Sequence, residues 1–346
     1  MIRLLAAAIA FALAGTAAAA PLVIAHRGAS GLRPEHTLAA YRLAIAQGAD
    51  FIEADLVSTR DGRLVARHEN EIGGTTDVAA HPEFAARRTT RTVDGRAVSG
   101  WFVEDFTLAE LNTLRARERL PDLRPANTAF DGQERVPTLE EVIALVQAEG
   151  RARGRAIGLY VETKHPAYFR ARGLPLEEPL VAALARAGYR DARDPLFIES
   201  FEVDNLRRLR RLTKLRLVQL MDAEGAPADG AGPAYAAMAT PAGLAAVARY
   251  ADGIGPAKAM LVRFDGATPA ATALVADAHR AGLVVHPWTF RRENAFLPPP
   301  LRRGTDPAAP GDDRSEYCAF LAAGVDGLFS DLPAAAVAAR ADCPKP

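Results

Sequence analysis

Two stretches decide how this chain is interpreted: Val23-Ile-Ala-His-Arg-Gly-Ala-Ser-Gly-Leu-Arg-Pro-Glu-His-Thr37 and, one predicted helix later, Phe51-Ile-Glu-Ala-Asp-Leu-Val57. In the first, an apolar run leads directly into His26 and Arg27, as at the end of a buried strand. A glycine-containing turn follows, and Thr37 can cap the helix after it. The pattern predicts a strand–turn–helix unit with titratable side chains at the turn.

The second stretch is an apolar run with two acids in its middle. Glu53 and Asp55 stand at positions i and i+2, and alternate residues of a strand point to the same face. Both carboxylates can therefore point to one place, which is unusual in a buried parallel strand. Such a pair alone is more often a solvated edge or a salt bridge, so its interpretation depends on partners elsewhere in the chain.

Length and composition favour a large core and a small-molecule substrate. The 346 residues are long for one domain, but α/β barrels reach this size as a single unit, and 49% of the residues are hydrophobic. Lys and Arg number 42, and so do Asp and Glu. This balance provides no global field that favours nucleic acid or an anionic membrane, although a local phosphate-binding patch stays open. We expect no nucleic-acid partner, and composition does not bear on the oligomeric state.

Residues 1–20 have the layout of a secretory signal peptide. Arg3 gives a short positive region, an apolar run extends from residue 4 to about 13, and alanines follow, with cleavage expected within 17–20. The run is too short to span a membrane, and a buried amphipathic helix is the alternative. We therefore expect an exported protein without stable membrane insertion, whose mature domain covers residues 21–346.

Cys318 and Cys343 are the only cysteines of the sequence. An even count in an exported protein is compatible with a disulfide, which would tie the C-terminal tail to the helix predicted around Cys318. Two free thiols are the alternative. Neither cysteine has the spacing of a metal site.

Short apolar runs alternate with amphipathic segments along most of the chain. We predict eight strands, each followed by a helix, and such alternation produces a parallel sheet. Eight units indicate an α/β fold of the (β/α)8 TIM-barrel type, with a doubly wound open sheet as the alternative. The predicted strands cover residues 22–25, 51–57 (extended at 64–66), 157–162, 196–201, 215–220, 252–254, 283–287 and 327–330, and the predicted helices 37–47, 138–148, 176–187, 203–212, 241–250, 269–281, 312–323 and 333–339.

Residues from about 70 to 135 interrupt the alternation after the second strand. They contain Gly73-Gly74, clusters of Thr and Arg, and one helix signal, a capping box from Thr107 to Glu110. A second capping box, from Thr138 to Glu141, marks the return of the alternating pattern. We therefore expect an inserted subdomain that packs on the barrel.

Active sites of barrels lie at the carboxyl ends of the strands, and this rule brings titratable residues together. His26 and Arg27 end the first predicted strand, and His68 follows the extension of the second. Glu162 and Lys164 end the third, again two residues apart. Charged groups from three successive strands should therefore meet at one rim.

Three acids, Glu53, Asp55 and Glu162, would converge there without histidine or cysteine ligands. Such a set suits a hard divalent cation such as Ca²⁺ or Mg²⁺, whereas zinc would recruit nitrogen or sulfur. Without a cation, the carboxylates would repel one another. His26 and His68 can serve as general acid and base beside the cation, because imidazole titrates near neutral pH.

Positive charge stands beside the predicted metal. Arg27 offers a fork and Lys164 a point charge to an anionic group, and a metal with both is what a phosphoryl centre requires. Trp288, directly after the seventh strand, is a candidate for substrate contact or barrel packing. His36 is placed in the first turn of its helix, with a functional role as the alternative, and His286 is left as a candidate pocket residue. His81 and His165 precede prolines in loop-like contexts and are interpreted as structural.

The chain resembles the glycerophosphodiester phosphodiesterases, in particular the exported, periplasmic type. The resemblance spans nearly the whole chain after residue 20 in the expected order, although each motif alone is weak. The matching motifs are His26-Arg-Gly-Ala with Pro34-Glu-His-Thr37, Glu53-Ala-Asp-Leu56, the Asp61-Gly62 turn that leads to His68, Thr75-Thr-Asp-Val78, Val161-Glu-Thr-Lys164, Ala251-Asp-Gly-Ile-Gly-Pro256, Val284-Val-His-Pro-Trp-Thr289 and Gly324-Val-Asp-Gly-Leu-Phe329.

The resemblance implies a TIM-type barrel with an inserted subdomain and a set of residue roles. By matching position, the metal ligands would be Glu53, Asp55 and Glu162, the acid/base pair His26 and His68, the phosphate-binding residues Arg27 and Lys164, and a residue that shapes the metal site Glu35. The implied cofactor is one divalent metal ion, commonly Ca²⁺ or Mg²⁺. The implied reaction is hydrolysis of a glycerophosphodiester to an alcohol and sn-glycerol 3-phosphate, in which a glycerol hydroxyl can attack phosphorus first and water then opens the cyclic phosphate.

Three positions depart from the family pattern. His68 is followed by Glu69 where the family usually has Asp, and Gly74 replaces an Arg before Thr-Thr-Asp77. Glu199 stands in the fourth strand where a polar amide is common. These departures concern the preferred head group more than the reaction.

Other functions are compatible with the same residues. The same chemistry could act on an intact lipid, as in phospholipases C and D, or on teichoic acid. The lack of an obvious apolar surface loop argues against an intact lipid, although the insertion could contain one. A protein that binds phosphodiesters without cutting them would not need both His26 and His68. A purely structural barrel would not explain three acids at one rim.

Overall fold

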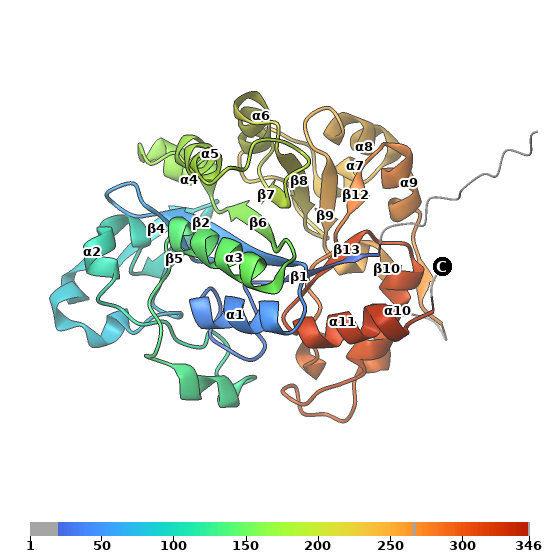
Figure 1. The fold of residues 1–346 in the computed structure, drawn as a ribbon, viewed down its shortest axis with the longest axis horizontal. Coiled ribbons are helices and arrows are strands. Elements are labelled where there is room, and N and C mark those ends of the chain that lie inside the picture. The colour runs from blue at the N-terminus through green and yellow to red at the C-terminus, as the bar shows by residue number, and fades with distance from the viewer. Residues whose placement is uncertain (1–19, 266–267, 345–346) are drawn as a thin grey trace, which may run out of the picture.

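The structure, a computed structural model, describes residues 20–265 and 268–344, so the predicted signal peptide lies outside the described residues except for its last alanine. Eight parallel strands form a nearly closed barrel (Figure 1), as predicted. They are β1 (Leu22–Ala25), β2 (Phe51–Ser58), β6 (Gly158–Thr163), β7 (Leu196–Ser200), β8 (Arg216–Met221), β9 (Gly253–Pro256), β12 (Val284–Val285) and β13 (Gly327–Ser330).

The order of the strands closes the sheet on itself. Hydrogen-bonded neighbours run β12-β9-β8-β7-β6-β2-β1-β13. The two ends of this path also meet, because the Asp326 backbone N–H donates to the Val285 carbonyl at 3.0 Å and the Phe329 N–H to the Pro287 carbonyl at 3.0 Å. The first and last strands are neighbours, with Leu22 in register with Gly327. This closure excludes the doubly wound open sheet.

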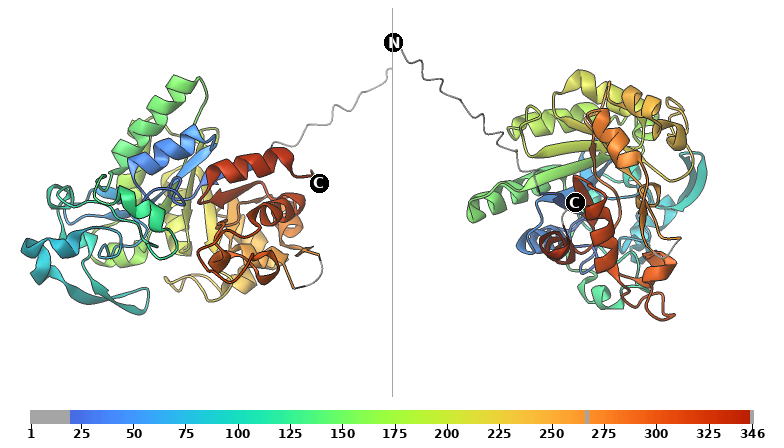
Figure 2. Two further views of the ribbon diagram at one scale, coloured as in Figure 1. Left: turned by 90° about the horizontal axis from the view of Figure 1, so that it is seen from below. Right: turned by 90° about the vertical axis from the view of Figure 1, so that its right-hand side faces the viewer.

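Helices surround the barrel (Figures 1 and 2), as the alternation requires. The principal ones are α1 (Leu38–Ala46), α3 (Leu139–Arg153), α5 (Glu177–Arg186), α6 (Val203–Leu212), α8 (Pro241–Val247), α9 (Leu274–Arg280), α10 (Asp313–Ala322) and α11 (Pro333–Asp342). Helix α9 begins later than predicted because Ala270–Ala271 forms β11, which pairs antiparallel with β10 (Val262–Arg263). Shorter helices are α4 (Pro166–Ala171) and α7 (Tyr235–Met238).

The interior of the barrel below the carboxyl ends of the strands is filled by one apolar cluster, which we call the lower layer. Tyr160 and Phe197 stack with their ring centroids 4.8 Å apart, and Phe51 lies 5.5 Å from Phe197. The strands therefore enclose a packed core rather than a channel. The lower layer consists of Ile24, Phe51, Tyr160, Phe197, Val218 and Phe329.

The segment from residue 70 to 135 contains local structure that its sequence pattern did not predict. β3 (Leu64–Ala66), just before it, pairs antiparallel with β2, and β4 (Thr89–Val93) forms a hairpin with β5 (Arg96–Gly100). The predicted capping boxes both form, at the start of α2 (Leu108–Leu111) and of α3. The rest of the segment is largely 3-10 turns and loops.

A disulfide joins Cys318 of α10 to Cys343, the residue directly after α11, so the structure favours the bridged alternative. Arg340 of α11 pairs with Asp50 and also donates to the Pro21 carbonyl at 3.0 Å. The C-terminal helix is thereby fixed against the first strand. Within the described ranges, no helix is both long and apolar enough to cross a bilayer.

Candidate active site

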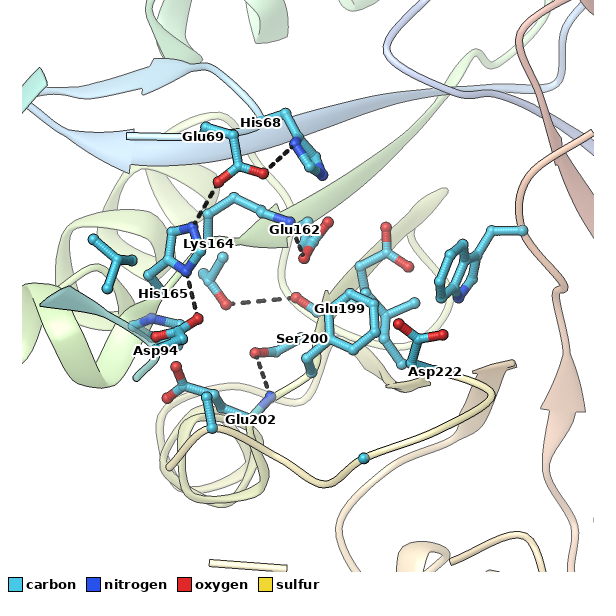
Figure 3. A pocket seen from close by; sticks show the side chains of 18 of the residues that line it. His68, Glu69, Asp94, Glu162, Lys164, His165, Glu199, Ser200, Glu202 and Asp222 are labelled. Carbon is cyan, nitrogen blue, oxygen red and sulfur yellow. Dashed lines mark hydrogen bonds and ion pairs between the residues drawn. The ribbon is translucent and has the colours of Figure 1, made fainter. Parts of the chain in front are cut away.

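A cavity of about 620 Å³ opens at the carboxyl ends of the strands (Figure 3). The structure brings all eight residues predicted for the site to this place. Asp55 is fully buried beside Glu53 and Glu162. The other predicted residues line the cavity: His26, Arg27, Glu53, His68, Glu162, Lys164 and Trp288.

The three acids form one buried cluster. Each offers a carboxylate oxygen, and these oxygens all lie within 4.8 Å of one another. Glu53 and Asp55 come from β2, and Glu162 comes from β6, where it is in register with Asp55. Two adjacent parallel strands with acids at alternate positions therefore suffice to build the cluster.

Burial disturbs the protonation of these acids. It raises the pKa of Glu53 well above its usual range, and the charge of Asp55 adds to the shift. Burial likewise raises the pKa of Glu162 to about 7, although the charge of Lys164 opposes it. Burial also opposes ionisation of Asp55, but the charge and hydrogen bond of His36 hold the pKa of that carboxyl well below its usual range.

The cluster has the chemistry of a site for a hard divalent cation. Its donors are all carboxylate oxygens, which Ca²⁺ and Mg²⁺ prefer. The Oδ1 atom of Asp55 is buried without a hydrogen-bond partner, and a buried oxygen of this kind is costly unless something binds it. The residues present therefore fit a metal ion of this class.

His26 reaches the cavity from the end of β1. Its Nδ1 lies 2.6 Å from Asp331 Oδ1, and its Nε2 lies 3.4 Å from Thr289 Oγ1. A carboxylate at Nδ1 favours the tautomer that carries its proton there, so Nε2 is left to exchange a proton in the cavity. Burial and then the charge of Arg27 lower the pKa of His26 to about 4, and the ring is neutral at pH 7.

Asp331 is itself held by two arginines. Arg124, from the inserted segment, donates through Nη2 to Asp331 Oδ2 at 2.5 Å and through Nε to Glu293 Oε1 at 2.6 Å. Arg291 donates through Nε to Asp331 Oδ2 at 2.9 Å. Reasoning from the sequence missed Asp331, although it directly follows the eighth strand and the rule of strand ends would have found it.

His68 stands at the head of a chain of side-chain contacts (Figure 3). Its Nδ1 lies 2.8 Å from Glu69 Oε1, and Glu69 Oε2 lies 3.2 Å from His165 Nε2. His165 Nδ1 then lies 2.6 Å from Asp94 Oδ2, at the turn of the β4–β5 hairpin. Burial, with the charges of Arg27 and Lys164, lowers the pKa of His68 to about 3.

His165 therefore does more than the structural role predicted for it, because it lines the cavity and links the barrel to the hairpin. Burial opposes its protonation, but hydrogen bonds to Asp94 and Glu69 raise the pKa of His165 to about 9. Glu69, one of the three departures from the family pattern, thus supports both histidines. Its longer side chain reaches two partners at once.

The two predicted phosphate ligands lie against the acids. The Arg27 backbone N–H donates to Glu53 Oε2 at 2.7 Å, and its Nε lies 3.3 Å from Asp55 Oδ2. Lys164 Nζ donates to Glu162 Oε1 at 3.0 Å. Arg27 has a positive φ of 59°, followed by Gly28 at 86°, where a Cβ would come within 2.8 Å of the helix α1 backbone. The glycine thus lets this turn pack tightly below the site.

The predicted position of His36 in the first turn of its helix is wrong. Helix α1 begins at Leu38 with Thr37 as its cap, and His36 lies before it with a positive φ of 56°. That conformation aims the fully buried ring at the site, where Nε2 lies 3.0 Å from Asp55 Oδ2 and Nδ1 lies 2.8 Å from the Tyr41 hydroxyl. His36 therefore orients Asp55.

Of the remaining candidate residues, Trp288 lines the cavity, whereas His286 and His81 do not. His286 contacts the Tyr160 hydroxyl at 2.9 Å within the barrel and does not line the cavity. His81 lies at the surface beside Glu83. Trp288 lines the cavity, and its Nε1 donates to the Gly255 carbonyl at 2.8 Å, which fixes the plane of the ring.

Glu199 is the last but one residue of β7, is in register with Glu162 and is fully buried. Neither of its carboxylate oxygens has a hydrogen-bond partner. Burial raises its pKa well above the usual range, and the charge of Glu53 adds to this. A protonated carboxyl has one donor and an acceptor, so Glu199 in this form resembles the amide that is common at this position in the family.

Fold and site together define a class of enzyme: (β/α)8 barrels that carry a carboxylate cluster and cationic side chains at the carboxyl ends of their strands. The model of the glycerophosphoryl diester phosphodiesterase family matches residues 26–335. The chain therefore belongs to this family, and it is an enzyme, a phosphoric diester hydrolase that acts on glycerophosphodiesters.

Curated relatives cover most of the chain. A glycerophosphodiester phosphodiesterase of Arabidopsis thaliana is 36% identical over 328 residues, which are 90% of this chain and 84% of the relative. One from Haemophilus influenzae is 32% identical over 338 residues, 90% of this chain and 87% of the relative.

Solved structures share the fold. A glycerophosphodiester phosphodiesterase from Agrobacterium tumefaciens has a TM-score of 0.57 at 22% identity, over 91% of this chain and 99% of that one. A phosphodiesterase from Oleispira antarctica, in complex with the product sn-glycerol-3-phosphate, has a TM-score of 0.60 at 23% identity, over 92% of this chain and 96% of that one.

Proposed function

We propose that this enzyme hydrolyses glycerophosphodiesters, the deacylated phospholipids, to an alcohol and sn-glycerol 3-phosphate, with one divalent metal ion held by Glu53, Asp55 and Glu162. The observation that carries the proposal is the buried three-acid cluster in one cavity with two histidines, each of which lies against a carboxylate. A bound Ca²⁺ or Mg²⁺ would neutralise the cluster and polarise a phosphoryl oxygen. The product bound to the Oleispira antarctica phosphodiesterase supports the product assignment.

His26 and His68 transfer protons in this proposal. Both rings are neutral at pH 7 in the substrate-free site, so either can accept a proton from an attacking hydroxyl. Asp331 and Glu69 stabilise the imidazolium that results, because each lies at the Nδ1 atom. The imidazolium formed in this way can then give the same proton to the leaving alcohol oxygen.

Arg27 and Lys164 hold the phosphate. Both line the cavity beside the acids, and a guanidinium and an ammonium stabilise the negative charge that grows on phosphoryl oxygens. Trp288 contributes an apolar face to the same cavity. We assign it to substrate contact.

A water-soluble diester fits this surface better than an intact lipid. Among the described residues, Leu212 is the one large apolar side chain that is exposed, and it lies at the end of α6. Enzymes that hydrolyse intact membrane lipids need a contiguous apolar surface to bind the membrane that holds their substrate. This observation favours deacylated phospholipids over phospholipase C or D substrates.

Release of sn-glycerol 3-phosphate from glycerophosphocholine tests the metal proposal. Activity should fall at least about a hundredfold after dialysis against EDTA and return with Ca²⁺ or Mg²⁺. Full activity in EDTA would overturn the metal assignment.

The acid/base roles have a separate test. His26→Ala and His68→Ala should each lower kcat by about 10²–10⁴-fold, while His81→Ala, the same change at a surface histidine, should not. A near-normal rate in either site variant would remove that residue from the mechanism. If the wild type showed no turnover but substrate raised its melting temperature, a binding function would replace the catalytic one.

We also propose that the protein is exported to the periplasm. The layout of residues 1–20 supports this, and the disulfide between Cys318 and Cys343 suits an oxidising compartment. The mass of the mature protein after expression in a Gram-negative host would show a loss of about twenty residues. An uncleaved protein in the cytoplasmic fraction would refute the proposal.

A further inference from the structure

One side of the cavity, which we call the acidic wall, is separate from the metal and phosphate residues. It follows β7, which is next to β6 in the sheet, and β8, which is next to β7, and it is completed by residues after β12 and on α7. We propose that the acidic wall binds a cationic head group of the substrate, an ammonium or a quaternary ammonium. The acidic wall consists of Phe201, Glu202, Asp222, Tyr235 and Trp288. The proposal rests on the proposed function, because it names the diesters that this site prefers.

Three aromatic rings give the acidic wall its shape. The Phe201 ring centroid lies 5.7 Å from that of Trp288 and 6.2 Å from that of Tyr235, both in edge-on arrangements. Aromatic faces attract cations, and clusters of them bind quaternary ammonium groups. The wall therefore offers the ring surface that such a head group requires.

Phe201 also connects the wall to the phosphate position. Lys164 Nζ, assigned to the phosphate, lies 5.7 Å from the Phe201 ring centroid. In choline and ethanolamine esters a short ethylene linker separates the ester oxygen from the nitrogen. A phosphate at Lys164 therefore places the nitrogen within reach of Phe201 and its neighbours.

The acids of the wall lack cationic partners. Glu202 is 3% exposed; its Oε2 accepts from the Ala167 N–H at 3.0 Å, and its Oε1 is buried without a partner. Asp222 is exposed in the loop after β8, and no basic side chain of the described residues forms an ion pair with either acid. Figure 3 shows both on the side of the pocket away from His68.

A cation in the cavity would change the ionisation of this side. Burial and then the charge of Asp94 raise the pKa of Glu202 to about 8, so its buried carboxyl is mostly protonated near pH 7 while no cation lies beside it. Burial and then the charge of Asp222 raise the pKa of Tyr235. A cationic head group would favour the ionised form of Glu202 and attract Asp222, whereas a neutral glycerol head group would do neither.

The test compares two substrates that differ in head-group charge, glycerophosphocholine and glycerophosphoglycerol, at one ionic strength. The wild type should have the higher kcat/KM for the choline ester. In Asp222→Asn the ratio of the two kcat/KM values should fall about three- to tenfold, and in Phe201→Leu by a similar factor. Asp222 is exposed and Asn has the same shape, so this variant should fold.

Asp204→Asn is the matched control, because Asp204 is exposed, lies two residues from Glu202 and does not line the cavity. Its ratio should equal that of the wild type. Equal kcat/KM for both esters in the wild type, or an unchanged ratio in both Asp222→Asn and Phe201→Leu, would refute head-group binding by the acidic wall and leave the proposed function intact. Release of sn-glycerol 3-phosphate from neither ester would overturn the proposed function together with it.

Discussion

The barrel interior has two layers that come from the same strands and have opposite energetics. In the lower layer, Phe51, Tyr160 and Phe197 stack on one another, while two residues further along β2 and β6 the upper layer begins with Glu53 and Glu162. We define the upper layer as Glu53, Asp55, Glu162 and Glu199. Apolar burial and ring packing stabilise the lower layer, whereas the upper layer holds buried acids whose protonation is disturbed.

This contrast shows where stability and activity come from. A pleated strand turns every second residue inward, so a fold that needs a core and a site can place them in succession on the same strands. The lower layer holds the barrel together. The upper layer destabilises it until positive charge binds there, which is typical of functional sites.

The largest effect should follow from Glu53→Gln. This change removes one ligand of the proposed metal and should lower turnover by about 10³-fold. It should also raise the stability of the metal-free protein at pH 7.5, because a carboxyl with a raised folded-state pKa disfavours folding above its unfolded-state pKa. Urea unfolding in EDTA at pH 4.5 and 7.5 measures the free energy of unfolding, and the gain in stability should appear only at pH 7.5.

Glu140→Gln, the same change at an exposed acid of α3, should alter neither quantity. A Glu53→Gln variant less stable than the wild type at pH 7.5 would show that the upper layer is not under electrostatic strain.

Phe197→Ala should lower the stability of the protein and leave turnover largely intact, the reverse of Glu53→Gln. It removes the ring that stacks on Tyr160 and contacts Phe51, and should cost about 3–5 kcal/mol of unfolding free energy. Turnover per folded molecule should change far less than in Glu53→Gln. Leu212→Ala, at an exposed apolar residue, provides the control for stability, and equal losses in both variants would contradict a structural lower layer.

A substitution of His165 tests the ion pairs that join the barrel to the β4–β5 hairpin beside the cavity. The folded-state pKa of His165, about 9, lies above the ordinary value, so its ion pairs contribute stability fully below pH 6.5, and the contribution disappears as pH rises through 9. His165→Gln should therefore cost about 1–2 kcal/mol at pH 6 and little at pH 10. The exposed His279→Gln is the control, and a loss independent of pH would refute this account.

The smallest effect is expected from Tyr160→Phe. The variant keeps the ring of the lower layer but removes the contact with His286 Nδ1. Stability should fall by about 1 kcal/mol, and turnover should stay at the wild-type value. Calorimetry with the turnover assay checks this, and a large loss of activity would mean that the two layers are coupled.

Much of this architecture could be predicted from the sequence because it depends on local patterns. The alternation of strands and helices predicted the barrel, and the rule of strand ends predicted that Glu53, Asp55 and Glu162 would converge. The capping boxes at Thr107 and Thr138 marked two helix starts correctly. Each of these predictions used only patterns that lie within short stretches of the sequence.

The failures concern features that depend on distant contacts or unusual backbone. His36 was misplaced because its positive φ arises from the packing of the turn rather than from its residue type. The β4–β5 hairpin lacks apolar alternation, since most of its residues are exposed. Arg124 could not be assigned, because its partners Glu293 and Asp331 lie far along the chain.

The pairing of β1 with β13, together with the contact between His26 and Asp331 across 305 residues, has a consequence for biogenesis. The proposed catalytic histidine near the start of the domain receives its aspartate only when the last strand has been synthesised and docked. A chain that lacks its last strand would therefore have no carboxylate to orient His26, and turnover would report on folding of the whole domain.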